Sequence, residues 1–200
     1  GTGGSNSPLQ FSGDTVTLDT GVTIGTGATI SASLANATFP AGHIIKSYCV
    51  TTNAQTNFAV GAWGDVISVT CDAAQSTSSK FNLFAMGHAG SNNDWLAKWR
   101  FYRNAVTGGP TASEIGTAVS HTGNIGATAV DSHYGTGDRQ LQNINLMWRD
   151  SASWGSGTIT YILQVYSGRG TVYINRPHVI GNDAISGSLT TSSFIIQEVA

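Results

Sequence analysis

The chain has 200 residues, of which 40% are hydrophobic and only 10% are charged. Apolar side chains are numerous enough for a buried core, whereas the charged fraction is far below the roughly 25% of an average soluble protein. With a net charge of −2 and no block of like charge, the chain lacks the positive charge that binding to nucleic acid requires. No apolar run is long enough to span a membrane. The surface is predicted to be polar but uncharged, so much of it could be covered in an assembly.

Residues 1–38 differ from the rest, because they consist of short strand-like units separated by Gly, Thr and Asp. Such units are too small to bury a face alone. We expect an extended arm or stem that pairs with other copies of the chain or anchors it on a partner. The alternative is that these units are the first strands of the main domain. The residues assigned to oligomerisation or anchoring are Val16, Leu18, Val22, Ile24 and Ile30.

Residues 39–200 are predicted to form one β domain with no helix. Period-2 alternation of apolar and polar residues predicts strands over 43–51, 65–71, 80–86, 95–103, 114–119, 141–149 and 189–199. The strongest signal lies at 158–176, where alternation interrupted by Gly168 and Gly170 predicts a β-hairpin with Tyr161 and Leu163 in the core. We therefore expect an all-β fold, an antiparallel β-sandwich that is jelly-roll-like.

The two cysteines, Cys49 and Cys71, lie in separate predicted strands. We expect a buried pair of thiols. A disulfide between neighbouring strands is the alternative, and it would need Cα atoms within about 7 Å. There is no CxxC motif and no histidine at ligand spacing, so we expect no zinc site.

Five tryptophans are many for this length, and an exposed ring beside a polar loop could stack on a sugar. Packing in the core or at a subunit interface is the alternative, and it is favoured for Trp99 and Trp148 inside predicted strands. A long loop predicted at 120–138, rich in Gly, Thr and His, is of the kind that carries function, although a solvated loop is the simpler interpretation. The candidate ligand-binding residues are Trp63, Trp95, Trp154, Tyr134, Asp131 and His133.

Motifs for catalysis or metal binding are missing from the sequence. There is no GxSxG motif, and no calcium-loop or zinc spacing occurs. Eleven acidic residues could contain a glycosidase pair, but such a pair is set by the fold and not by sequence spacing. We expect no enzymatic activity, no metal and no cofactor.

Several short motifs occur in order along the chain: SSK at 78–80, WRFYRN at 99–104, TYILQV at 160–165, VYINR at 172–176 and SFIIQEV at 193–199. Together they resemble the C-terminal β-sandwich domains of bacteriophage tail-fibre and head-fibre proteins, notably from marine phages. The segment TVTLDTGVTIGTGATIS at 15–31 is similar to the β-rich stems or anchors that precede such domains. The sequence has no long shaft of the kind found in a complete tail fibre.

The resemblance implies a structural protein of the virion surface, usually a homotrimer, that binds other virion proteins of the capsid or tail. We expect it on the virion surface after assembly in the host cytoplasm, as a capsid decoration, head-fibre or tail-fibre subunit. A receptor-binding tip that reads host-surface glycans is the alternative. A free carbohydrate-binding module, outside any virus, is the third hypothesis. Neither a nucleic-acid partner nor membrane insertion is expected.

Overall fold

A computed structural model describes residues 41–91, 95–116, 129–133, 141–177 and 189–200, all within a compact unit that spans 38–200. No helix in these ranges is long and apolar enough to cross a membrane. The expected arm at 1–38, with its five apolar anchoring residues, lies outside the described ranges, as does Tyr134.

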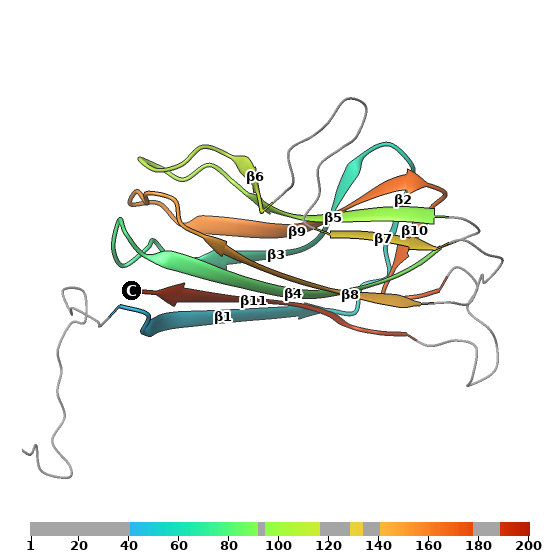
Figure 1. Cartoon of the computed structure of the whole chain (residues 1–200), viewed down its shortest axis with the longest axis horizontal. Coiled ribbons are helices and arrows are strands. Elements are labelled where there is room, and N and C mark those ends of the chain that lie inside the picture. The colour runs from blue at the N-terminus through green and yellow to red at the C-terminus, as the bar shows by residue number, and fades with distance from the viewer. Residues whose placement is uncertain (1–40, 92–94, 117–128, 134–140, 178–188) are drawn as a thin grey trace, which may run out of the picture. The chain divides into compact units, whose positions relative to one another are not determined.

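The described residues form two antiparallel sheets. The strands are β1 (Ile44–Thr52), β2 (Asn57–Phe58), β3 (Trp63–Cys71), β4 (Lys80–Ser91), β5 (Trp95–Arg103), β6 (Ser113–Ile115), β7 (Ala129–His133), β8 (Gln142–Asp150), β9 (Ile159–Arg169), β10 (Val172–Ile174) and β11 (Ser192–Val199). Figure 1 shows the sheets as two stacked layers, with β1, β11, β4 and β8 in one and β3, β9 and β5 in the other. We call these layers sheet A and sheet B.

The strand pairing defines a jelly roll. In sheet A, β1 pairs with β11 and β4 pairs with β8, whereas in sheet B, β3 pairs with β9 and β5 pairs with β6 and β7. These pairs are nested along the chain: β3 and β9 lie between β1 and β11, β4 and β8 lie between β3 and β9, and β5 and β7 lie between β4 and β8. A long hairpin rolled over itself produces this order, and contacts of β11 with β4 and of β9 with β5 close the two sheets. The predicted all-β, jelly-roll-like sandwich is confirmed.

The core lies between the sheets and follows the predicted alternation. Every second residue of β9 from Ile159 to Val165 is fully buried, as are Trp99 and Phe101 of β5. Phe101 stacks on Phe194 of β11, with ring centroids 5.4 Å apart, and so connects sheet B to sheet A.

The predicted hairpin at 158–176 is wrong, although both of its strands exist. The second strand, β10, pairs with Ala89–Ser91 of β4 and not with β9, so the chain crosses from sheet B to sheet A. Gly170 has a φ of +62°, and the Ser167 hydroxyl donates to its carbonyl at 2.6 Å, which fixes the bend. Alternation shows that a strand exists but not which sheet it joins.

The predicted loop at 120–138 contains strand β7, so Asp131 and His133 are strand residues and not loop residues. Asp131 pairs with Ala97 and His133 with Trp95 along β5. Strand β6 pairs only with the end of β5 at Phe101–Arg103, which leaves the start of β5 for β7. The other residues of that loop lie outside the described ranges.

The expected buried thiol pair is also wrong. Both cysteines are free, and Cys71 is buried whereas Cys49 is exposed. Cys49 follows Tyr48, which packs against the core, and successive residues of a strand point to opposite faces. Cys49 therefore lies on the outer face of sheet A. Cys71 belongs to β3 in sheet B, so the two cysteines are in different sheets.

Candidate functional site

An apolar row crosses the outer face of sheet A. Cys49 of β1 is the register partner of Ile195, Ile195 is that of Phe84, and Phe84 is that of Met147 on β8. Paired residues of antiparallel strands point to the same side. Leu83, which precedes Phe84 in β4, is fully buried, so the row faces away from the core. We call Cys49, Ile195, Phe84 and Met147 the apolar row.

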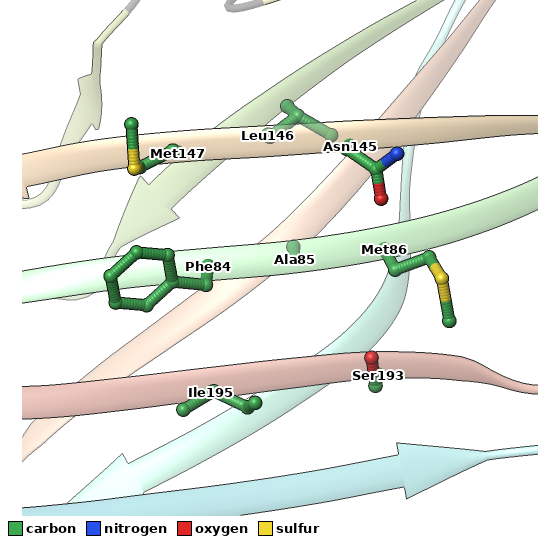
Figure 2. Close-up of a pocket in the computed structure, with 8 residues that line it drawn as sticks. All are labelled: Phe84, Ala85, Met86, Asn145, Leu146, Met147, Ser193 and Ile195. Carbon is green, nitrogen blue, oxygen red and sulfur yellow. The ribbon is translucent and has the colours of Figure 1, made fainter.

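Two adjoining hollows follow the apolar row. The first, of about 320 Å³, is lined by residues of β4, β8 and β11, and Figure 2 shows Phe84, Met86, Met147 and Ile195 around it. The second, of about 410 Å³, lies beside Met147 and Trp148. Met147 is 70% exposed. Trp148 is 46% exposed, but it is the register partner of the buried Leu83 and therefore belongs to the other side of β8. A single exposed apolar side chain is ordinary, but a contiguous group marks a contact surface.

The outer face of sheet A around the apolar row is almost uncharged. The register places Thr51, Ser193, Met86 and Asn145 on one side of it and Ser47, Gln197, Asn82 and Arg149 on the other. In these three rows Arg149 is the single charged side chain, and its Nε donates to Asn82 Oδ1 at 2.7 Å. These three rows contain no carboxylate and no histidine, so they offer no acid–base pair. Depletion of charge around Met and aromatic side chains is typical of the centre of a protein–protein interface.

The outer face of sheet B, in contrast, carries a chain of polar side chains. The Gln164 amide donates to Asp65 Oδ1 at 2.6 Å and accepts from Arg100 Nε at 2.8 Å, and Arg100 also forms an ion pair with Glu114. Burial lowers the pKa of Arg100, and the Glu114 carboxylate opposes this shift. These bonds connect β3, β9, β5 and β6, so the chain is a structural link across the sheet.

Trp63 lies beside this polar chain. Its ring centroid is 5.5 Å from that of Tyr166, its register partner, and the Arg100 guanidinium covers one ring face at 3.9 Å. Trp63 is half-buried. Of the predicted sugar-stacking tryptophans, it is the one that the structure places at an outer face.

Trp154 is a core residue, which corrects its expected role as a ligand platform. Only 2% of it is exposed, its ring packs edge-on against Phe81 at 4.8 Å, and its indole nitrogen donates to the Ser79 carbonyl at 2.6 Å. Its position beside a loop predicted the reverse, because proximity to a loop in sequence does not fix the direction of a side chain. Trp99 is buried, as core packing predicts, whereas Trp148 is 46% exposed in the single chain, so only packing at a subunit interface remains for it as a prediction. The side chain of Trp95 lies outside the description.

A charged cluster lies inside the sandwich. Arg103 forms a buried ion pair with Asp150, and the Tyr161 hydroxyl donates to Asp150 Oδ2 at 3.2 Å. Burial raises the pKa of Tyr161, and the Asp150 carboxylate adds to the shift. Arg103, Asp150 and Tyr161 each bond within the cluster, while the buried Nε of Arg103 has no hydrogen-bond partner. Among the described residues, no group of three His, Cys, Asp or Glu side chains converges to hold a metal ion.

The sequence interpretation did not include the apolar row, although a signal for it was present. Phe84 and Met86 interrupt the polar positions of the strand at 80–86, and Ile195 does so in the strand at 193–199. Strands with one solvated face alternate cleanly, so apolar residues on both faces indicate that both faces are covered. The register then brings these positions together, which sequence alone could not predict.

No protein-family model matches the chain, and no curated protein matches it either. The resemblance to phage fibre domains therefore stays a prediction.

Proposed function

We propose that this protein is a non-enzymatic structural subunit of the bacteriophage virion surface, a capsid decoration, head-fibre or tail-fibre subunit that assembles as a homo-oligomer. The observation that supports this proposal best is the apolar row on an otherwise nearly uncharged sheet face. Exposed apolar residues that form a contiguous patch mark protein contact surfaces. The low charged fraction of 10% and the resemblance to phage fibre domains support the same conclusion.

The polar groups of the described region support a structural role over an enzymatic one. Arg103 forms an ion pair with Asp150, and Arg100 forms an ion pair with Glu114. The hollow at Phe84 and Met147 has a mainly apolar lining and lacks a titratable group. An active site would instead combine a pocket with convergent polar groups of perturbed pKa.

A receptor-binding role is the second candidate function, and the Trp63–Tyr166 pair favours it. These rings lie beside Gln164 and Arg100, and aromatic faces next to planar polar groups suit a sugar ring and its hydroxyls. Binding of the purified protein to a glycan array, lost in Trp63→Ala and retained in Trp148→Ala, would support this role. An array with no signal above background would count against it.

The structural role is tested by mass spectrometry of purified particles together with light scattering of the isolated chain. The protein is expected in the particle fraction after gradient purification, and the isolated chain is expected at three times its 20.8 kDa mass. A protein that remains in the soluble lysate, free of particles, and that is monomeric when purified would contradict the proposal.

A further inference from the structure

We propose that the homo-oligomer forms through the outer face of sheet A, with three copies arranged so that each apolar row runs alongside a common three-fold axis. This inference rests on the proposed homo-oligomeric function and adds its interface. The apolar row of each copy therefore contacts the apolar rows of the two neighbouring copies.

The charge of this face favours a second copy as the partner. Where the apolar row of each copy runs alongside a three-fold axis, every charge in the row lies near the same charge of the other two copies, so a charged row would repel itself. The apolar row and its two flanking rows contain one charged side chain, Arg149, at the edge strand β8. A nucleic acid or a strongly charged protein would require opposite charge on this face.

The shape of the patch favours three copies over two. The apolar row is one residue wide except beside Met86, and the other residues of its two flanking rows are Ser, Thr, Asn, Gln and Arg149. Three flat faces around an axis approach each other most closely along one line on each face, and they diverge on both sides of that line. A narrow apolar strip between polar rows fits this geometry. Two sheets stacked face to face, about 10 Å apart, would instead press the polar rows together as well.

The side chains of the row suit this contact. Met147, which is 70% exposed, is unbranched and flexible, so it can fill an irregular space between copies. Phe84 and Ile195 are half-buried by their own strands and supply the firm centre of the strip. Burial of these side chains by a neighbouring copy would remove the exposed apolar surface of the isolated domain.

Cys49 provides a reporter within the row itself. It is exposed and free in the single chain, and it lies at the β1 end of the row. The other cysteine, Cys71, is buried, and burial raises the pKa of its thiol to about 12. A thiol reagent at neutral pH therefore reacts with Cys49 in the folded chain and not with Cys71.

The test combines light scattering with the rate of maleimide labelling at Cys49, read by mass spectrometry, on the full chain. We expect a trimer whose Cys49 reacts at least tenfold more slowly than in Met147→Glu, which places a charge at the axis and yields a monomer. Ser68→Glu is the matched control, since Ser68 is exposed on β3 of sheet B. It should remain a trimer with a protected Cys49, and circular dichroism should show that both variants fold.

The outcomes separate the interface from the function. A trimer in which Cys49 reacts as fast as in Met147→Glu overturns the interface and leaves the homo-oligomeric subunit standing. A dimer overturns the three-fold arrangement even if Cys49 is protected. A monomeric parent chain with a reactive Cys49 overturns both the interface and the homo-oligomer.

Discussion

Arg103, the last residue of β5 in sheet B, forms an ion pair with Asp150, the last residue of β8 in sheet A. Both side chains are more than 90% buried, and Tyr161 shares the Asp150 carboxylate. The pair therefore connects the two layers within the core. Two buried charges stabilise a fold only while each has its partner, so this pair makes the packing of the sheets sensitive to a single substitution.

The first prediction concerns this ion pair. Asp150→Ala should lower the free energy of unfolding by about 3–5 kcal/mol, because it leaves the Arg103 guanidinium buried without its partner. Urea unfolding followed by tryptophan fluorescence measures the change. The double variant Arg103→Met with Asp150→Ala should be less destabilised than the sum of the two single variants. Additive losses would mean that the two charges do not interact.

The second prediction concerns alkaline pH. An ordinary cysteine thiol has a pKa of 9.0 and a tyrosine 10.0, whereas burial raises the pKa of Cys71 and of Tyr48 to about 12. The unfolded chain therefore loses these protons at a lower pH than the folded chain. Stability should be complete below pH 9 and should fall between about pH 9 and 12, by up to ~1.4 kcal/mol per pH unit for the buried Cys71. The loss from Tyr48 should be smaller, because its side chain is only partly buried and solvent screens its charge.

Thermal unfolding over a pH series measures this loss. Cys71→Ala should flatten the slope near pH 9 to 10, since the thiol no longer contributes. Ser68→Ala, at an exposed residue of the same strand, is the matched control and should keep the slope of the parent chain. The burial argument for Cys71 fails if the slope of Cys71→Ala equals that of the parent chain.

The third prediction separates two tryptophans that the sequence treats alike. Trp154→Ala should cost about 3–5 kcal/mol of stability, because it removes a fully packed ring and leaves the Ser79 carbonyl without its donor. Trp63→Ala, at a half-buried position, should cost clearly less. Denaturant midpoints of both variants test the order, and equal losses would contradict the assignment of Trp154 to the core.

The fourth prediction tests the central strand of sheet B. Leu163→Asp places a carboxylate in the fully buried centre of β9, where the structure offers it no counter-charge at that position, and should cost several kcal/mol or more. Thr160→Asp, on the outward side of the same strand, should change the melting temperature far less. Similar melting temperatures for both variants would mean that β9 faces the other way.

The fold could be predicted from the sequence wherever one face of a strand meets the core. Alternation located β5 and β9, including the burial of Trp99, Tyr161 and Leu163, because a strand with one covered face has a period of two. The destination of β10 could not be predicted, since Gly170 permits either a hairpin or a crossing to the other sheet.

The candidate site was less accessible from the sequence than the fold. The apolar row combines residues from four strands, from Cys49 of β1 to Met147 of β8, and only the register places them side by side. Sequence proximity to loops misplaced Trp154, and sequence separation concealed the pairing of Arg103 with Asp150. Each error concerns the direction or partner of a side chain, which tertiary packing decides.

The mass of the purified 200-residue chain by light scattering, measured beside Met147→Glu, tests the account most directly. We predict three times 20.8 kDa for the parent chain and a single chain mass for the variant, because a charge in the apolar row cannot be covered by a neighbouring copy. A parent chain that is monomeric at micromolar concentration, with the variant indistinguishable from it, would contradict the proposal of a homo-oligomeric surface subunit.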